Sequence, residues 1–398
     1  MLYILILTLT GFGPWESVGP QGGEMKAVLQ STQDANTLFA MSGTYPTQVV
    51  RSTDGGATWE TISTFTNSTP YDMVMTENGT LVALGSSRTW RSTDEGLTWT
   101  ENYVTSSIFY DGEAHPSDGD RLFVAGYSYS GGTWNISLFK SVDCGVSWSS
   151  TTVASAGYST YGRSIAVSAS DPDRIVIGGY GYSSGYYPMF YISDDGGTTF
   201  ADITPPSASY YFQGAAIHPS QQDVILAGDL VNVFRSDDAG ATWTNVSSTY
   251  QNSEIRYSKA DSDLLLAGGS SQVLSSADGG SSWTGSSSGL SGSGIRWAVP
   301  DRTDADIAYT GTSTGFYFSS DAGQTWSSSN GGLLIGRVLA MENVDGWIYM
   351  NMQDMGLFRG EDLSTITWEQ VDTPLSCGDF CDIESLSSDT ILALEGAG

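Results

Sequence analysis

One eight-residue pattern, Ser-x-Asp-x-Gly-x-x-Trp, recurs along this chain and constrains its fold more than any other feature. Seven copies are present, and their acidic residues are Asp54, Asp94, Asp143, Asp195, Asp238, Asp278 and Asp321. Phe200 replaces Trp in the fourth copy, and an eighth, degraded copy runs from Arg359 to Trp368. Successive aromatic positions are 40, 49, 52, 43, 40, 43 and 42 residues apart. So steady a spacing indicates one structural unit per copy.

The chemistry of the motif predicts a tight turn between two strands. A short Asp side chain can accept backbone N–H groups across the turn, Gly supplies a positive φ, and Trp packs on the returning strand. The period fits a four-stranded blade of a β-propeller. Between copies, apolar runs such as 163–167 and 174–177 flank an Asp-Pro turn and read as the inner strands. We therefore expect an all-β fold, a β-propeller of four-stranded antiparallel blades, with each motif between the third and fourth strand.

The number of blades follows from assigning the remaining strands. Residues 15–18 read as a lone fourth strand, and residues 390–394 as the second strand of an unfinished blade. Eight blades is our first interpretation. Seven blades followed by the start of a second unit is the alternative, because the eighth motif is degraded. We treat 14–398 as a single propeller that is incomplete at its C-terminus.

The first residues of the chain suggest export. Residues 1–9 are nearly all apolar, and the run breaks at Gly11, Gly13 and Pro14. Such a run is too short to span a bilayer, which takes about 20 residues, but it suits the apolar centre of a signal peptide. We therefore predict a signal peptide in 1–13, the alternative being a buried first strand. No other segment reaches the length of a membrane span, so we expect a secreted or cell-surface protein.

The seven motifs resemble the Asp-box (BNR) repeats of the sialidase superfamily, and the resemblance covers nearly the whole chain. It implies a propeller fold but no single function, because similar repeats occur in sialidases, xyloglucanases, sortilin-type receptors and a photosystem II assembly factor. In those families the box is structural and lies on the face away from the active site. The resemblance thus implies scaffold roles for the seven Asp residues.

Two loops that lengthen the repeat are rich in aromatic residues. They join the second and third strands of adjacent blades, at 126–135 and 178–188. In a propeller these loops share one face, opposite the boxes, with the connections between blades. Tyr and Trp separated by Gly suit stacking on sugar rings or on a protein partner; packing of the loops against each other is the alternative. The candidate binding residues are Tyr127, Tyr129, Trp134, Tyr161, Tyr182, Tyr186, Tyr187 and Trp297.

Basic residues are scarce, yet five of the 15 fall near the start of the innermost strand. They are Lys26, Arg163, Arg256, Arg296 and Arg337. This position lies on the same face as the aromatic loops, so the cations could surround the mouth of the central channel. Arginine suits a carboxylate, and sialidases bind the carboxylate of their substrate with three arginines. Ion pairs with neighbouring acids are the alternative role.

Catalytic residues are not identified by the sequence. A glycosidase needs two carboxyl groups across the scissile bond, and nothing pairs any of the candidates Asp72, Glu113, Asp229, Glu254 and Asp354. The two histidines, His115 and His218, precede Pro at equivalent turns, so we assign them turn roles rather than Ser-His catalysis. Cys377 and Cys381 could form a disulfide, and Cys144 is left over. We expect no metal and no cofactor, because three cysteines and two distant histidines lack zinc-ligand spacing.

The charge balance excludes one class of partner. With 15 Lys and Arg against 44 Asp and Glu, the net charge is -29, whereas nucleic-acid binding needs a basic face. We therefore predict a monomeric, non-catalytic propeller that binds glycan or an extracellular protein. A glycoside hydrolase is the first alternative, and an assembly factor like the photosystem protein is the second.

Overall fold

A computed structural model gives the architecture. It describes residues 25–43, 45–66, 68–248, 254–295 and 297–330, without the side chains of Lys26 and Thr105, and beyond residue 337 only the backbone of six strands. The regular elements of these residues are all β-strands, and none of the described residues forms a helix that could cross a membrane. The chain divides into two compact units, one of which, Gln21–Gly336, we call the ring unit.

The ring unit consists of antiparallel sheets whose strands follow one another in space as in the chain. Its first three repeats contain β1 (Met25–Gln30), β2 (Leu38–Ser42), β3 (Thr47–Ser52), β4 (Glu60–Phe65), β5 (Asp72–Met75), β6 (Leu81–Leu84), β7 (Ser86–Ser92), β8 (Thr100–Ala114), β9 (Leu122–Ser130), β10 (Thr133–Ser141) and β11 (Ser149–Ala154). Strands β5 to β11 form one sheet, because the long β8 is the outer strand of the second repeat and the inner strand of the third.

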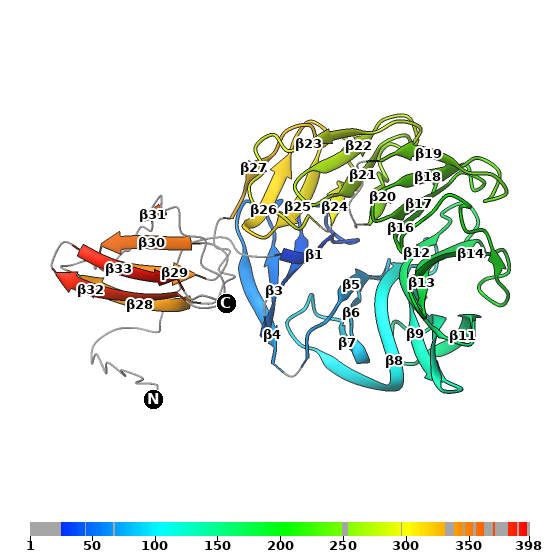
Figure 1. Cartoon of the computed structure of the whole chain (residues 1–398), viewed down its shortest axis with the longest axis horizontal. Coiled ribbons are helices and arrows are strands. Elements are labelled where there is room, and N and C mark those ends of the chain that lie inside the picture. Colours follow the sequence, from blue (N-terminus) through cyan, green and yellow to red (C-terminus); the bar gives the residue numbers. More distant parts are fainter. Residues whose placement is uncertain are drawn as a thin grey trace. The chain divides into compact units, whose positions relative to one another are not determined.

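Four further sheets of four strands complete the ring unit. They contain β12 (Ser159–Val167), β13 (Ile175–Tyr182), β14 (Tyr186–Ser193), β15 (Ala201–Asp202), β16 (Phe212–Ile217), β17 (Ile225–Asp229), β18 (Val233–Ser236), β19 (Thr244–Ser247), β20 (Ile255–Tyr257), β21 (Leu265–Gly268), β22 (Val273–Ser276), β23 (Thr284–Ser286), β24 (Ala298–Pro300), β25 (Ala308–Thr312), β26 (Gly315–Ser319) and β27 (Ser327–Ser328). With β8 counted twice, the described strands of the ring unit form seven four-stranded repeats, arranged around a centre (Figure 1).

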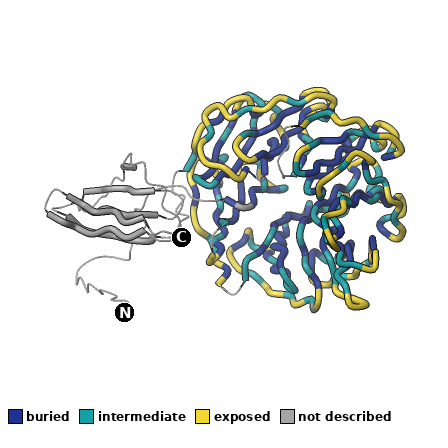
Figure 2. Tube along the Cα trace, in the orientation of Figure 1, coloured by how far each residue is buried: buried dark blue, intermediate teal, exposed yellow. Residues whose placement is uncertain are grey.

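Burial falls from the inner strands to the outer ones (Figure 2). The second strands β2, β6 and β17 are buried at every position, whereas the outer strand β4 is largely exposed. Inner strands are covered on both faces by neighbouring sheets and therefore read as continuous apolar runs rather than alternating ones. The core thus lies between adjacent sheets.

The seven motif turns share one hydrogen-bond pattern. In the first, Ser52 Oγ donates to Asp54 Oδ1 over 2.8 Å and accepts the N–H of Gly56, and Asp54 Oδ1 accepts the N–H of Thr58. The other six turns repeat these contacts. Gly56 has φ 89°, and a Cβ there would lie 2.5 Å from the Phe316 ring. The described Asp side chains of these turns are therefore engaged inside their own turns.

The first and seventh repeats pack against each other and close the ring. β1 lies beside β24 and β25. Trp59 of the first motif contacts Phe316, with ring centroids 4.7 Å apart, and its Nε1 donates to the carbonyl of Ser329. Gln30 Nε2 also donates to Asp301.

The C-terminal strands form a unit that we describe by itself. A four-stranded sheet contains β28 (Val338–Val344), β29 (Trp347–Met352), β30 (Gly356–Glu361) and β31 (Glu369–Gln370), and β32 (Cys381–Ser387) pairs with β33 (Thr390–Glu395). The strand expected at 390–394 is β33. The count of eight blades is not confirmed, and the number of blades in the whole chain stays a prediction.

One sequence expectation about this fold was wrong. Residues 126–135 and 178–188 were expected as loops, but they are mostly strand: β9 and β10 turn at Gly131-Gly132, and β13 and β14 turn at residues 183–185. The alternation of Tyr with Gly or Ser favours paired strands over loops. The expectations for 1–13, 15–18, the degraded motif at 362–368 and Cys377 lie outside the described residues.

Candidate functional site

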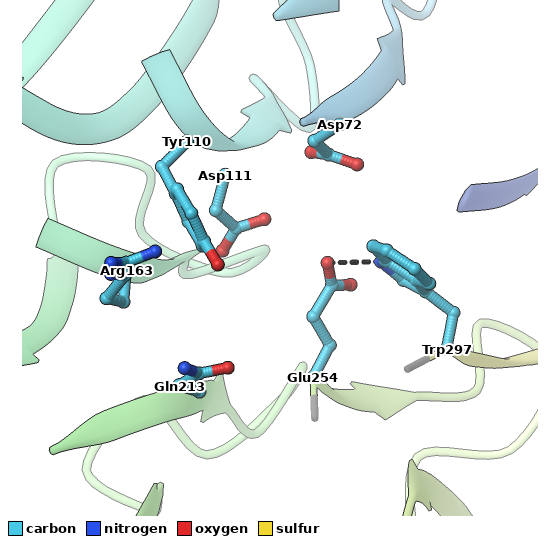
Figure 3. A pocket seen from close by; sticks show the side chains of 7 residues that line it. All are labelled: Asp72, Tyr110, Asp111, Arg163, Gln213, Glu254 and Trp297. Carbon is cyan, nitrogen blue, oxygen red and sulfur yellow. Dashed lines mark hydrogen bonds between the residues drawn. The ribbon is translucent and has the colours of Figure 1, made fainter. Parts of the chain in front are cut away.

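Three bulges direct side chains toward the mouth of the central channel. Tyr110 of β8, Arg163 of β12 and Gln213 of β16 are each the extra residue in the pairing of an inner strand with its neighbour. A bulge leaves one residue unpaired and redirects its side chain. All three side chains line one pocket (Figure 3).

The same pocket gathers three carboxyl groups. One oxygen from each of Asp72, Asp111 and Glu254 lies within 4.8 Å of the others. Asp72 Oδ2 accepts the N–H of Gly112 over 3.1 Å, and Asp111 Oδ2 accepts the N–H of Ile165 over 2.8 Å. Each Asp therefore ties its own inner strand to that of the next repeat, which is a structural role for both.

Glu254 is held by two partners, Arg256 two residues further along its own segment and Trp297 just before β24 of the next repeat. Arg256 Nε donates to Glu254 Oε2 over 2.7 Å, and Trp297 Nε1 donates to Oε1 (Figure 3). Two of the candidate binding residues, Arg256 and Trp297, are thus occupied with an acid of the chain. Trp297 is also buried, so its ring is not a surface for a ligand.

Burial raises the pKa of the two aspartic acids of the pocket. It raises the pKa of Asp72 to about 7, with a further rise from the charge of Glu254. Burial, Glu254 and Asp72 together raise the pKa of Asp111 well above its usual value. Burial also raises the pKa of Glu113, farther down the channel. A carboxylic acid that keeps its proton near neutral pH is able to act as a proton donor.

The space between these groups is small. The pocket measures about 10 Å³, which is room for about one water molecule. A sugar ring does not fit between the carboxyl groups as they lie here. Three carboxylates are also suitable ligands for a hard cation, but the ion pair of Glu254 with Arg256 and the retained protons oppose that use.

An aromatic surface adjoins the pocket. We call it the tyrosine surface; it consists of Tyr127, Tyr129, Trp134, Tyr161, Tyr180, Tyr182, Tyr186 and Tyr211. Most of these residues come from the hairpins β9–β10 and β13–β14. Tyr180 lies at its centre, with ring centroids 4.9 Å from Tyr161, 5.3 Å from Tyr186 and 5.2 Å from Tyr211. Tyr158 and Tyr187 form a separate pair on the other face of the β13–β14 hairpin.

The outermost rings of this surface face solvent. Tyr129, Tyr182 and Tyr186 are between 49% and 56% exposed, whereas Tyr127, Trp134 and Tyr161 are half-buried. Packing of the loops against each other, the alternative role, therefore holds for the inner rings. Tyr129 contacts Trp134 on the paired strand β10, and Tyr182 contacts Tyr186 on the paired strand β14, so these exposed rings are supported by neighbouring rings. Tyr187 is 43% exposed on the other face of its hairpin.

Arg163 connects the two features. Its guanidinium lies 4.2 Å from the ring centroid of Tyr110 and 5.5 Å from that of Tyr180, and its Nη2 donates to the Tyr180 hydroxyl over 3.2 Å. Of the five cations near the start of the inner strand, the structure describes the side chains of Arg163 and Arg256. Arg296, Arg337 and the side chain of Lys26 lie outside the described residues.

The structure brings only some of the candidate carboxyl groups together. Asp72 and Glu254 come together, and Glu113 lines the channel below them. Asp229 accepts the N–H groups of Val231 and Asn232 in its own turn, and Asp354 lies outside the described residues. Sequence reasoning missed Asp111, Tyr110, Gln213 and Tyr180. The alternation of Tyr180 with Tyr182 on one strand could have indicated Tyr180 from the sequence. The bulges that place Tyr110 and Gln213 in the pocket have no sequence signal.

Below the pocket, the inner strands enclose a cavity of about 490 Å³. Glu77 of the second repeat forms ion pairs there with Lys259 of the sixth and Arg302 of the seventh, at 3.1 and 3.2 Å. Because these repeats are not neighbours of the second, the ion pairs reach across the channel and stabilise the ring.

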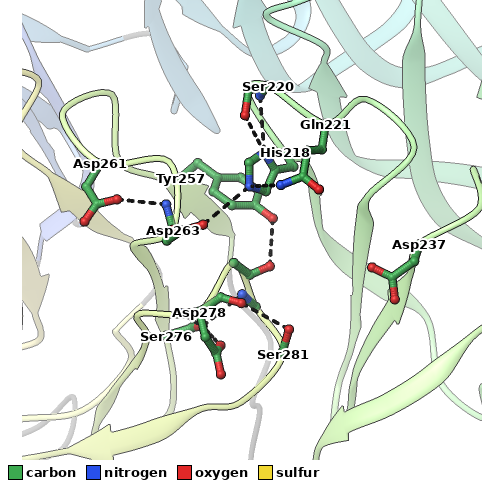
Figure 4. A network of polar contacts seen from close by, with 12 residues as sticks. His218, Ser220, Gln221, Asp237, Tyr257, Asp261, Asp263, Ser276, Asp278 and Ser281 are labelled. Atoms are coloured by element: carbon green, nitrogen blue, oxygen red, sulfur yellow. Dashed lines mark hydrogen bonds and ion pairs between the residues drawn. The ribbon is translucent and has the colours of Figure 1, made fainter.

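The histidines lie at turns on the face of the motifs. His218 Nδ1 accepts the N–H of Ser220 over 3.2 Å, as His115 Nδ1 accepts that of Ser117 (Figure 4). His218 Nε2 lies 3.8 Å from Asp263 Oδ1, beyond hydrogen-bond distance. Ser220, His218 and Asp263 therefore do not form a catalytic triad, and burial lowers the pKa of the imidazole.

Comparison with known proteins supports the fold. No family model matches the chain. A xyloglucanase of Paenibacillus sp is 22% identical over 311 residues, which are 64% of this chain and 29% of that protein. The chain therefore spans less than a third of that relative.

Two solved structures share the architecture. An ancestral GH74 enzyme superposes with a TM-score of 0.75 at 15% identity, over 98% of this chain and 60% of that one. YCF48 bound to a D1 peptide superposes with a TM-score of 0.55 at 14% identity, over 78% and 96%. At these identities the likeness shows the fold alone, and the predicted β-propeller is confirmed.

Proposed function

We propose that this chain binds glycan through the tyrosine surface and does so without catalysis. The observation that carries the proposal is the set of exposed rings on two neighbouring hairpins, Tyr129 on one and Tyr182 and Tyr186 on the other. Sugar rings stack on such flat faces, and the hydroxyl groups at the ring edges can donate to sugar oxygens. The likeness to a xyloglucanase adds support, since that protein is named for a polysaccharide.

Rigidity favours the proposal further. The exposed rings rest on half-buried ones, so that binding orders few side chains and loses little conformational entropy. Tyr and Trp also supply large contact areas with only two rotatable side-chain bonds each.

Affinity electrophoresis in gels containing xyloglucan, xylan, mixed-linkage glucan or pectin tests this function. The variant Tyr182→Ala/Tyr186→Ala removes two exposed rings, and we expect its affinity to fall roughly thirtyfold, because two lost stacking contacts at about 1 kcal/mol each cost about 2 kcal/mol. Tyr103→Ala is the matched control, because Tyr103 is 62% exposed on β8 and lies outside the tyrosine surface. Thermal unfolding of both variants checks that they fold.

Two results would count against the proposal. If the wild-type protein migrates equally fast in gels with and without each of the four polysaccharides, glycan is not the ligand. Equal losses for the double variant and for Tyr103→Ala mean that the tyrosine surface is not the binding site. If a protein co-purifies from the native source and is lost with the double variant, the surface binds protein instead.

Glycoside hydrolysis is the second candidate, and the grouping of Asp72, Asp111 and Glu254 favours it. Retaining glycosidases place their two carboxyl groups about 5 Å apart, and a raised pKa suits the acid. The small pocket argues against it. Release of reducing sugars from xyloglucan that stops in Asp111→Asn but not in Tyr103→Ala would support hydrolysis.

We further propose that the chain acts outside the cell or at its surface. The apolar run at 1–9 supports this location. The test is recovery from the medium after expression with and without residues 1–13. Retention of both forms inside the cell would contradict it.

A further inference from the structure

Arg163 is the one described channel-mouth cation that no acid of the chain neutralises. In the described part of the chain, seven other arginines form ion pairs with Asp or Glu: Arg51, Arg88, Arg121, Arg174, Arg235, Arg256 and Arg302. Arg163 forms none with the described residues, although the sequence holds 44 Asp and Glu. Arg91 of β7 also forms no ion pair with the described residues, but its Nε donates to the carbonyl of Cys144. Among the described arginines, Arg163 is the one whose buried Nε has no acceptor.

The guanidinium is also short of hydrogen bonds. Its Nη2 donates to the Tyr180 hydroxyl, while its Nε is buried and has no acceptor among the described residues. Leaving a buried donor unpaired costs about 1–3 kcal/mol. The contacts with Tyr110 and Tyr180 stabilise the cation in part, but aromatic rings carry no negative charge.

The nearest acids are committed elsewhere. Asp111 and Asp72 share the pocket with Arg163, but each accepts a backbone N–H. Their pKa values are raised by burial and by Glu254, so that their protonated, neutral forms are favoured. Glu254 itself is paired with Arg256. The positive charge of Arg163 is therefore available to a ligand.

The position of this charge matches the proposed binding surface. Arg163 is half-buried and contacts Tyr180, the centre of the tyrosine surface, whose outer rings are exposed. A ligand stacked on Tyr186, which contacts Tyr180, brings its substituents toward the guanidinium. Arginine offers a planar set of donors that matches a carboxylate.

We propose that the glycan bound by the tyrosine surface is an acidic one and that its uronic acid carboxylate pairs with Arg163. The inference rests on the proposed function and names the substrate class. Arg163 alone pairs with the carboxylate in this proposal, because Arg256 is already paired with Glu254.

A matched pair of polymers tests the inference. Polygalacturonate and its methyl ester share one backbone and differ only in the charge of the carboxyl group. In affinity electrophoresis we expect the wild-type protein to bind the free acid at least tenfold more tightly than the ester. Arg163→Gln should abolish that preference and leave the weaker binding of the ester unchanged.

Arg88→Gln is the matched control. Arg88 also lies near a tyrosine ring, 5.9 Å from the centroid of Tyr103, but it is paired with Glu101 and lies on β7, in another repeat. Its loss should not alter the preference. Arg163→Lys keeps the charge and loses the planar donors, so it should retain part of the preference.

A second measurement does not depend on how the variants fold. Free glucuronate should compete with polymer binding to the wild-type protein better than glucose or methyl glucuronate ester does. Equal competition by all three overturns the inference.

The outcomes separate this inference from the function on which it rests. If the wild-type protein binds the acid and the ester equally well and Tyr182→Ala/Tyr186→Ala binds neither, the inference is overturned. Glycan binding by the tyrosine surface then stands. If Arg163→Gln weakens the binding of the acid and of the ester to the same extent, the inference is also overturned. Arg163 would then only hold the tyrosine rings in place. If the acid binds through Arg163 but the double tyrosine variant is unaffected, the anion site stands and the proposed function fails. If neither polymer nor glucuronate binds, the inference fails; glycan binding fails with it only if xyloglucan, xylan and mixed-linkage glucan do not bind either.

Discussion

The carboxyl group of Asp72 should make the protein less stable as the pH rises. Burial and Glu254 raise its pKa from 3.8 to about 7 in the folded state. Between these values the unfolded chain releases the proton and the folded one keeps it. The folded state then binds more protons, so the free energy of unfolding falls with pH through this window and levels off above it. Asp72→Asn removes the ionisation and keeps an acceptor for the N–H of Gly112.

The magnitude follows from the part of the window that is measured. Between about pH 5.5 and the folded-state pKa of about 7, the folded group keeps its proton over roughly 1.5 pH units while the unfolded one has lost it. Each unit lowers the free energy of unfolding by about 1.4 kcal/mol, and above about pH 7 the loss levels off. We therefore expect Asp72→Asn to stabilise the protein by about 2 kcal/mol more at the higher pH. Asp72 is 3% exposed, so solvent screening does not reduce this value.

Urea unfolding followed by tryptophan fluorescence at the two pH values measures the difference. Asp301→Asn is the control, because the pKa of Asp301 is shifted in the opposite direction. Burial raises the pKa of Asp301, but hydrogen bonds from Thr303, Tyr309 and Gln30 outweigh burial and lower it. Its replacement should therefore destabilise the protein equally at both pH values. The reasoning is refuted if Asp72→Asn has the same effect at both, or destabilises more at the higher pH.

Two further predictions concern the scaffold. Ser193→Ala should lower the free energy of unfolding by about 1–3 kcal/mol, because the buried N–H of Gly197 loses its acceptor; an unchanged urea midpoint would contradict this. Gly179→Ala should disrupt the β12–β13 pairing, since its Cβ would lie 2.1 Å from the carbonyl oxygen of Tyr161, whereas Gly185→Ala meets no atom within 4 Å and should be neutral. Thermal midpoints compare the two, and equal midpoints would show that the backbone there adapts.

The scaffold could be predicted because its determinants are local in the sequence. The Ser, Asp and Gly of each motif make their hydrogen bonds within five residues, so a sequence pattern contains both partners. The fourth strand and its turn repeat with each copy. The fold class therefore followed from the motif and its period.

The site could be predicted only in part, because its partners come from different repeats. Asp72, Asp111 and Glu254 are far apart in the sequence, and no local pattern reports that their oxygens meet. The bulges that redirect Tyr110 and Arg163 depend on pairing between strands. The ion pair of Arg256 with Glu254 is instead local, because the two residues are two apart in the sequence. It shows that a cation at the expected repeat position is not necessarily available to a ligand.

The most direct test of the central claim is a crystal structure of the protein with a uronic acid oligosaccharide. The account predicts sugar rings stacked on Tyr182 and Tyr186, with a carboxylate about 3 Å from the guanidinium of Arg163. An oligosaccharide bound only on the face of the motif turns, or away from the tyrosine surface, would contradict it.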